Sequence, residues 1–205
     1  MLTLFHSPMS RSTTMVSAID EMGLTAEIDI RLTPIRRADG SGGQDPDNPH
    51  PDGKVPALVH DGAVITERPA ILIYLSELFP QAAAIRPVGH PQRGPFLTWL
   101  AYYAGVVEPV LVADAAGLTH PYLSHTFRGP KELAHRMANT LSDGREYLLP
   151  DGFSTVDLLM ASPFLWMRDA LPDDPKVVAW FDRVAARPSV ITAAQRDQED
   201  IASLA

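Results

Sequence analysis

The chain has 205 residues, of which 45% are apolar, and its 17 basic and 25 acidic side chains give a net charge of −8. This composition is that of a globular protein with a sizeable core, and it excludes a disordered or collagen-like chain. A negative net charge repels a phosphate backbone, so we expect no nucleic acid partner. The length fits one large or two small domains.

The chain contains no cysteine. This excludes disulfides, thiolate–metal sites and a cysteine nucleophile, so any sulfur chemistry must use a thiol from outside. The seven histidines lack the spacing of metal ligands, and we expect no metal. The N-terminus lacks a charged segment followed by a long apolar one, and no apolar stretch is long enough to span a bilayer. We therefore expect no membrane association and a cytoplasmic location.

The first 80 residues predict a small α/β domain. The apolar run 2–6 predicts a buried strand, and the alternation of apolar and charged residues over 28–32 predicts a second one. Between them, apolar residues at helical spacing predict a helix that ends at Gly23. A strand, a helix and a strand in this order indicate a parallel crossover.

A loop, a hairpin and a helix are expected to complete this domain. The segment 33–53 is rich in proline and glycine and predicts a loop. Two short apolar runs, 57–60 and 63–66, flank Asp61-Gly62, a dipeptide favoured in two-residue hairpin turns. The following helix has Pro69 in its first turn. The predicted order is β-α-β-loop-β-β-α.

Beyond residue 80 the sequence predicts only helices. Prolines and glycines mark a linker at 81–91, so we expect one domain at 1–80 and an all-α domain at 92–205. His120 and His125 are expected in a surface loop. The helical patterns cover 96–116, 131–149, 155–169, 176–186 and a final turn or two after Pro188.

Two segments of the first domain allow both a structural and a functional interpretation. Pro56 precedes a strand, which suits either an edge-strand entry or a cis peptide that leaves the Val55 backbone free to pair with an extended ligand. Thr66 can cap the helix at Pro69, with Glu67 complementing its positive end. Alternatively, the N–H groups there hold a ligand carboxylate and Glu67 binds a ligand ammonium.

Serines at 7, 10 and 12 lead into the first helix. They can serve as N-caps, or a hydroxyl can stabilise an anion such as a thiolate at the helix start. We find no histidine or acid placed to make a serine nucleophilic, and the GxSxG pattern is absent, so a hydrolase is not expected. Ser154 and Asp157 form the pattern of a capping box.

The segments Lys54-Val55-Pro56-Ala57-Leu58, Ile65-Thr66-Glu67-Arg68-Pro69-Ala70-Ile71 and Phe153-Ser154-Thr155-Val156-Asp157, in this element order, resemble the cytosolic glutathione transferases. The chain looks most like bacterial members with a serine-type first helix. The resemblance implies a thioredoxin-like N-terminal domain, an all-helical C-terminal domain and a homodimer. The apolar residues Ile73, Tyr74 and Phe79 on the helix after Pro69 are consistent with a dimer contact.

The resemblance also implies a glutathione site. The Val55 backbone would pair with the cysteinyl part of glutathione, with Pro56 in the cis form, and Lys54 would reach the glycyl carboxylate. Glu67 and the following residue would hold the γ-glutamyl end. That following residue is Ser or Thr in many members, whereas here it is Arg68.

Ser10 best matches the hydroxyl that activates the thiol, with Ser7 and Ser12 as the alternatives. The loop 33–53 replaces part of the usual second helix, and Arg36 or Arg37 in it would line the glutathione pocket instead. The resemblance covers nearly the whole chain.

We therefore expect a transferase that activates glutathione, its co-substrate, for attack on a small hydrophobic electrophile, as in detoxification. The electrophile would contact Met9, Tyr102, Tyr103 and Val106. The alternatives are a glutathione- or ligand-binding protein with little turnover, a structural dimer module, and a glutathione-dependent isomerase, dehalogenase or peroxidase.

Overall fold

The computed structural model describes residues 1–204, which pack as two units. Residues 1–85 form the N-terminal unit together with the C-terminal helix that follows residue 186, and residues 86–186 form the helical unit. This grouping differs from the predicted limits of 1–80 and 92–205, because the last helix packs mainly against the first helix of the chain.

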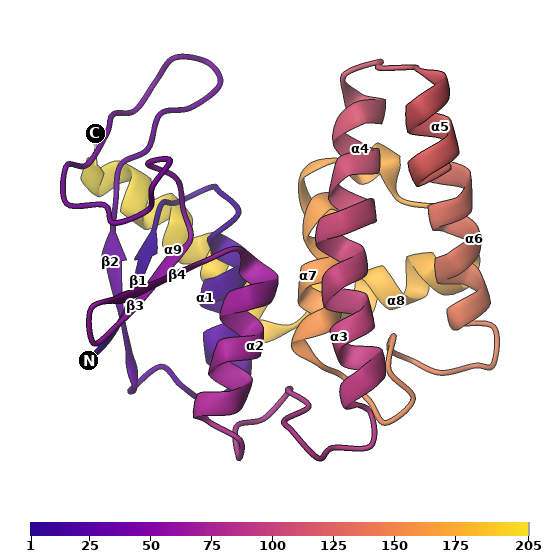
Figure 1. Cartoon of the computed structure of the whole chain (residues 1–205), viewed down its shortest axis with the longest axis horizontal. Helices are drawn as coiled ribbons and strands as arrows, with labels where there is room; N and C mark the ends of the chain where they lie inside the picture. Colours follow the sequence, from indigo (N-terminus) through magenta and orange to yellow (C-terminus); the bar gives the residue numbers. More distant parts are fainter. Residues whose placement is uncertain (205) are drawn as a thin grey trace. The chain divides into compact units, whose positions relative to one another are not determined.

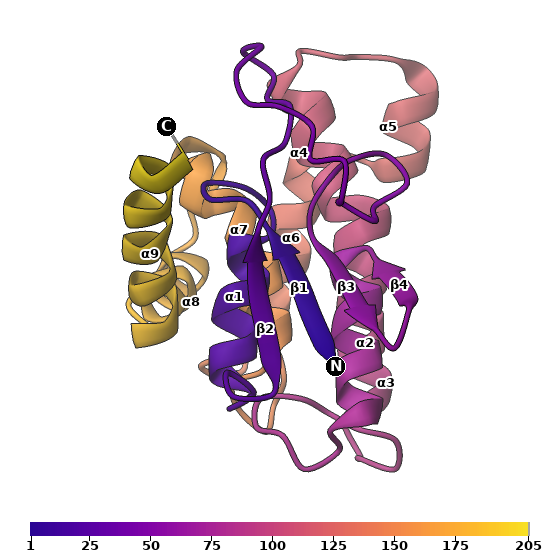
Figure 2. The ribbon, with the colours of Figure 1, turned by 90° about the vertical axis from the view of Figure 1, so that its left-hand side faces the viewer.

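The elements of the N-terminal unit before its last helix are β1 (Leu2–His6), α1 (Thr13–Glu21), β2 (Ile28–Leu32), β3 (Ala57–His60), β4 (Ala63–Thr66) and α2 (Arg68–Leu78). They confirm the predicted α/β order. The strands form one sheet, whose strand order in the described residues is β2-β1-β3-β4. β2 runs parallel to β1, whereas β3 is antiparallel to both β1 and β4. Figures 1 and 2 show α1 and α2 next to this sheet.

Glycine-containing turns connect these elements as the sequence predicts. Gly23 follows α1 with φ 71°, and the N–H of Leu24 donates to the Ile19 carbonyl at 3.0 Å, which completes a Schellman-type helix end. Asp61 and Gly62 both have positive φ, as the two-residue turn of a β-hairpin requires. Local sequence is therefore sufficient to explain the ends of these elements.

The loop between β2 and β3 is fastened to the end of β1 by Arg37. Its guanidinium donates to the Pro8 carbonyl at 2.7 Å and to the Met9 carbonyl at 3.2 Å. Gly42 closes the turn that carries Arg37: its φ is 78°, and a Cβ there would lie 2.1 Å from the Ile35 carbonyl oxygen. The loop thus needs a glycine at this position.

The C-terminal helix α9 (Pro188–Leu204) is much longer than the turn or two predicted from sequence. It lies along α1 (Figures 1 and 2). Arg187, just before α9, makes two bonds of 2.6 Å to the Glu21 carboxylate, and the Ser189 hydroxyl donates to the same group. These contacts tie the end of the chain to its beginning.

The helical unit differs from the sequence prediction at three positions. The pattern at 96–116 forms one continuous helical run that contains a π-helical segment. The helix predicted at 131–149 is α6 (Pro130–Thr140), which ends at Thr140 because Asp143-Gly144 turns the chain. Residues 121–127, expected in a loop, form a short helix whose first amide donates to the His120 ring. The elements are α3 (Arg93–Tyr102), the π-helical segment η1 (Tyr103–Val107), α4 (Glu108–Ala115), α5 (Pro121–Phe127), α6 (Pro130–Thr140), α7 (Thr155–Trp166), the 3₁₀ turn η2 (Arg168–Ala170) and α8 (Pro175–Ala185).

The buried helix α7 forms the core of this unit, and the predicted capping box begins it. The Asp157 carboxylate accepts from the Ser154 amide, the Leu148 amide and the Trp180 indole, each at 2.9 Å. The box therefore does more than cap a helix: it joins α7 to α8 and to the loop before α7.

By length and composition alone, the continuous helical run Arg93–Ala115 would suffice to cross a membrane. Core helices of water-soluble proteins meet the same criterion, so this property assigns no membrane span. The absence of a membrane partner stays a prediction.

Candidate functional site

Strand register brings three of the predicted site segments to one end of the sheet. Phe5 in β1 pairs with Ala57 in β3, and Ala57 pairs with Thr66 in β4. The residues after β1, before β3 and after β4 therefore lie at the same end of the N-terminal unit. These are the segments 7–12, 54–56 and 67–68.

The segment before β3 has the geometry that the functional interpretation requires. The Val55–Pro56 peptide bond is cis, which was one of the two options left open by the sequence. Within the described residues, no hydrogen bond involves the Val55 backbone. Lys54 is exposed, and its ammonium lies 3.8 Å from the Asp52 carboxylate. This segment offers free backbone groups next to an exposed cation, a combination suited to a peptide with a carboxylate end.

Glu67 stands at the N-terminus of α2 with an unusual backbone. Its φ of 64° lies in the left-handed region, and its exposed side chain makes no capping bond. The expectation that Thr66 caps this helix is wrong, because Glu67 is itself the N-cap residue. The first N–H groups of a helix lack partners within the helix and carry its positive dipole end. An exposed carboxylate beside such groups suits a zwitterionic ligand.

Arg68 follows Glu67 but turns its side chain inward. It is buried, and its guanidinium lies 3.5 Å from the Thr14 hydroxyl of α1. The side chain therefore does not replace the exposed hydroxyl that many family members have here.

The three serines after β1 form one hydrogen-bonded cluster. The Ser10 hydroxyl donates to the Ser7 carbonyl at 2.7 Å and lies 2.8 Å from the Ser12 hydroxyl. Ser7 and Ser12 are buried, with 1% and 0% exposure, whereas Ser10 is partly exposed. Among these three serines, Ser10 is thus the one whose hydroxyl a ligand can reach.

Sequence reasoning missed two residues behind this cluster. The buried ring of His6 lies 2.7 Å from the Ser12 hydroxyl through Nδ1, and 3.1 Å from the Asp197 carboxylate through Nε2. The expectation that no histidine or acid is placed near the serines is therefore wrong. Asp197 comes from α9, 191 residues away in sequence from His6, and no local pattern signals this contact. An inward-facing histidine at the end of an apolar strand was the available signal.

The Asp197 carboxylate binds the serine turn at several points. Burial by itself raises the pKa of Asp197, but hydrogen bonds from His6, the Thr13 hydroxyl and the Met9 amide outweigh it and hold the pKa below its ordinary value. The bonds from Met9 and Thr13 are both 2.6 Å long. Asp197 is accordingly a carboxylate at neutral pH, and it fixes the backbone around Ser10.

The two arginines of the loop 33–53 have different surroundings. Arg36 is exposed, whereas Arg37 is partly buried and uses its guanidinium on the carbonyls of Pro8 and Met9. Arg37 therefore supports the turn that carries Ser10. A direct role for Arg36 in ligand binding stays a prediction.

The predicted electrophile contacts lie in both units. In the N-terminal unit, Met9 is 36% exposed and has a positive φ. In the helical unit, Tyr103 is buried and Val106 is half-buried within the π-helical segment, a feature often found at functional sites. The Arg136 guanidinium stacks 3.6 Å from the centre of the Tyr102 ring, and burial raises the pKa of Tyr102 in spite of this cation.

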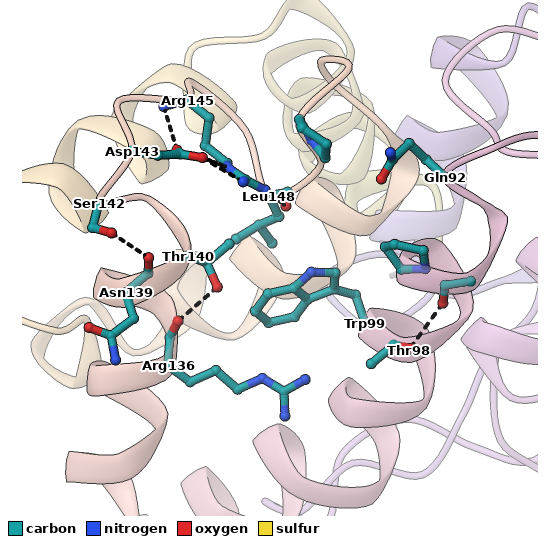
Figure 3. A pocket seen from close by; sticks show the side chains of 13 residues that line it. Gln92, Thr98, Trp99, Arg136, Asn139, Thr140, Ser142, Asp143, Arg145 and Leu148 are labelled. Carbon is teal, nitrogen blue, oxygen red and sulfur yellow. Dashed lines mark hydrogen bonds and ion pairs between the residues drawn. The ribbon is translucent and has the colours of Figure 1, made fainter.

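A cavity of about 740 Å³ opens in the helical unit (Figure 3). Trp99 and Arg136 lie on one part of its wall, and the Arg145–Asp143 ion pair, with a 2.6 Å contact, lies on another. Tyr102, Tyr103 and Val106 are not among its lining residues. The lining residues are Gln92, Gly94, Pro95, Thr98, Trp99, Arg136, Asn139, Thr140, Ser142, Asp143, Arg145, Leu148 and Pro150.

Within residues 1–204, no group of three or more acidic or histidine side chains is arranged to hold a metal ion.

Comparison with known proteins supports the resemblance seen in the sequence. Residues 1–77 match the family described as glutathione S-transferase, N-terminal domain. Glutathione S-transferase GstA of Escherichia coli O157:H7 is 26% identical, with 69% of this chain and 72% of that protein aligned. A sphingomonad glutathione S-transferase, solved in complex with glutathione, superposes with a TM-score of 0.74 at 25% identity, covering 96% of this chain and 98% of the other.

A further relative is Protein LigF of Sphingobium sp. strain SYK-6, which is 25% identical over 69% of this chain and 73% of its own length. Its solved structure, described as a beta-etherase, has a TM-score of 0.64 at 22% identity and covers 95% of this chain and 99% of that one. Together these comparisons confirm the predicted resemblance and the fold.

Proposed function

Since residues 1–77 match the N-terminal domain of glutathione S-transferases and the whole chain is similar to solved members of that family, we propose that it binds glutathione at the carboxyl end of β1 and activates the thiol for attack on a small hydrophobic electrophile. A glutathione transferase or a related glutathione-dependent activity follows from the family. The site, the donor to the thiol and the electrophile are our proposal.

The observation that carries the proposal is the meeting of three segments at one end of the sheet. Glutathione is an extended tripeptide with two carboxylates, an ammonium and a thiol. The free Val55 backbone suits its cysteinyl unit, and the exposed Lys54 suits its glycyl carboxylate. Glu67 and the start of α2 suit the ammonium and carboxylate of the γ-glutamyl end.

Ser10 is the proposed donor to the thiol. A free thiol with a pKa of about 8.5 is only a few per cent ionised at neutral pH. A hydroxyl donor near a helix N-terminus lowers this pKa by roughly one to two units, each worth about 1.4 kcal/mol, because both favour the anion. Thiolate then becomes a major species, and binding both reactants supplies their proximity.

The remaining parts of the proposal rest on the family alone. Met9, Tyr102, Tyr103 and Val106 stay the predicted contacts of the electrophile, and Tyr103 is the weakest candidate because it is buried. A homodimer and a cytoplasmic location are proposed on the same basis.

Titration calorimetry with glutathione tests the proposal through Glu67→Ala. A charge-assisted hydrogen bond is worth about 1.5–3 kcal/mol, so the variant should bind glutathione roughly tenfold or more weakly. Glu27→Ala removes an exposed glutamate that precedes β2 and serves as the control, with wild-type affinity expected. Equal affinity of the folded Glu67→Ala variant and the control would remove Glu67 from the site.

A second reaction class is favoured by the similarity to LigF, whose solved structure is described as a beta-etherase. In an ether-cleaving reaction the glutathione thiolate displaces an aryl-oxide leaving group, so the same site would serve. Product analysis with an aryl halide and a β-aryl ether in parallel distinguishes the two classes.

A further inference from the structure

A chain of hydrogen bonds runs from Ser10 to a carboxylate on α9. Ser10 Oγ lies 2.8 Å from Ser12 Oγ, which lies 2.7 Å from Nδ1 of His6. Nε2 of His6 lies 3.1 Å from Oδ1 of Asp197. His6 and Ser12 are 0% exposed and Asp197 is 1% exposed, whereas Ser10 is partly exposed. The chain of bonds thus has one end that a ligand can reach and one end buried.

Asp197 determines which nitrogen of His6 carries the hydrogen. Its other oxygen, Oδ2, already accepts from the Met9 amide and the Thr13 hydroxyl, and these two bonds favour the ionised form. An ionised carboxylate only accepts, so Nε2 of His6 must donate to it. In the neutral ring, Nδ1 is then an acceptor, and the Ser12 hydroxyl donates to it.

We propose that His6 takes up the thiol proton of bound glutathione through Ser10 and Ser12, and that Asp197 stabilises the resulting imidazolium. This inference rests on the proposed function, because it needs the thiol beside Ser10. In the structure the Ser10 hydroxyl donates to the Ser7 carbonyl, and for the transfer it turns to Ser12 Oγ, which lies 2.8 Å away. The thiol proton then moves to Ser10 Oγ, the Ser10 proton to Ser12 Oγ, and the Ser12 proton to Nδ1 of His6. Each oxygen gains one proton and loses one, so the products are a thiolate and an imidazolium.

The arrangement after this transfer stabilises the thiolate. The imidazolium donates to Ser12, Ser12 donates to Ser10, and Ser10 donates to the sulfur. Backbone amides hold the two oxygens throughout: the Ser7 amide donates to Ser12 Oγ and the Ser12 amide to Ser10 Oγ, both at 3.1 Å. The buried positive charge forms next to a carboxylate, and a buried ion pair whose members are hydrogen-bonded is tolerated.

Other charged groups also lie around this chain of bonds. From the loop after β2, the Arg37 guanidinium reaches Ser7 Oγ at 3.5 Å. From β2, the Arg31 guanidinium lies over the ring of Phe5, the neighbour of His6. On α9, Arg196 pairs with Asp200 at 3.5 Å. A guanidinium has no site that accepts a proton, so the imidazole of His6, at the end of the chain of bonds, is the acceptor among these groups.

The wild-type protein tests this inference by proton counting. Calorimetry in two buffers of different ionisation enthalpy gives the protons released when glutathione binds, and S-methylglutathione, which has no thiol proton, gives the background. Ultraviolet thiolate absorbance gives the thiolate formed, and with no cysteine in the chain it arises from glutathione alone. We expect far less than one proton released per thiolate. Release of about one proton per thiolate would overturn the inference.

Two variants interrupt the transfer at different places. His6→Gln removes the acceptor, and Ser12→Ala breaks the chain of bonds while leaving the His6–Asp197 pair. In each, we expect the thiolate fraction near neutral pH to fall roughly tenfold, one pKa unit, and every thiolate formed to release about one proton. Asp200→Asn, at the next turn of α9, should behave as the wild type.

The outcomes separate this inference from the proposed function. If both variants release as few protons per thiolate as the wild type does, a group other than His6 accepts the thiol proton and the inference is wrong. Binding of glutathione with full proton release by the wild type contradicts the relay but leaves the proposed function standing. A wild-type protein that binds no glutathione contradicts both.

Discussion

Two buried aspartates, one in each packing unit, have pKa values that are shifted in opposite directions. In the helical unit, burial raises the pKa of Asp157 above its ordinary value, although bonds from Leu148, Trp180 and Ser154 lower it. In the N-terminal unit, the bonds to Asp197 outweigh burial, and its pKa falls below the ordinary value. Both residues are at most 1% exposed, but Asp157 is the more deeply desolvated of the two, so burial and hydrogen bonding together set the difference.

The partners of each carboxylate explain what it does. Asp157 joins a loop, a helix start and an indole within the core, and its role there is to hold packed elements together. Asp197 binds an imidazole and the turn between Met9 and Thr13, where the candidate site lies. One buried acid therefore serves stability, whereas the other shapes a site that a ligand reaches.

The largest expected effect is that of Asp157→Ala. The change leaves the Leu148 amide, the Ser154 amide and the Trp180 indole without their acceptor in the core, at about 1–3 kcal/mol each. We expect a loss of about 3–5 kcal/mol in the free energy of unfolding, measured by urea denaturation. Asp143→Ala removes an exposed partner of Arg145 and should leave the free energy of unfolding nearly unchanged. Similar losses in both variants would contradict the role of Asp157.

Asp197→Ala should act locally. It leaves the Met9 amide and the Thr13 hydroxyl unpaired and frees the His6 ring, with an expected loss of about 2–3 kcal/mol. Hydrogen exchange should rise in residues 7–13 and in α9, while α7 and α8 keep wild-type protection. Equal deprotection of the helical unit would show that the two aspartates do not differ in this way.

Acid should destabilise the N-terminal unit before it destabilises the helical unit. Opposing the effect of burial, the Arg187 guanidinium and the Ser189 hydroxyl lower the pKa of Glu21, as the partners of Asp197 lower its pKa. A carboxyl with a lowered folded-state pKa stabilises the fold above its unfolded pKa, and this stabilisation is lost as pH falls through the folded value. The raised pKa of Asp157 has the opposite effect on stability, because protonation of this carboxyl at low pH favours the folded helical unit.

As the pH falls below about 4, the contact between α1 and α9 should therefore weaken before the helical unit does. Trp99, Trp166 and Trp180 all lie in the helical unit, so their fluorescence reports on that unit. Hydrogen exchange in α9 reports on the other. A fluorescence change that precedes the loss of protection in α9 would reverse the expected order.

The smallest effect concerns the backbone of Glu67. A non-glycine residue with a left-handed backbone costs about 1 kcal/mol, so Glu67→Gly should raise the free energy of unfolding by roughly 0.5–1 kcal/mol. Its affinity for glutathione should fall as in Glu67→Ala. Ala84→Gly relieves a similar φ of 57° away from the sheet end and should stabilise without changing affinity. No gain in either variant would exclude strain at these positions.

Most of the elements follow from local sequence. Gly23 and Asp61-Gly62 end or turn elements through their own backbone preferences, and the apolar spacing around them sets the strand or helix between. The capping box at Ser154 and Asp157 spans four residues, so a short pattern suffices to predict it. The site segments 54–56 and 67–68 were predicted from a family resemblance, and strand register brings them together.

The sequence by itself determined the N-terminal elements, the capping box and the resemblance to the glutathione transferases, because each depends on residues close together in the chain or on short motifs. Only the tertiary structure decided that α9 packs on α1 and that Asp197 reaches His6, Met9 and Thr13 across 184 to 191 residues. It also decided that Ser10 is the accessible serine and that Arg68 points inward. These features depend on which surfaces meet in the folded chain, and no local periodicity carries that information.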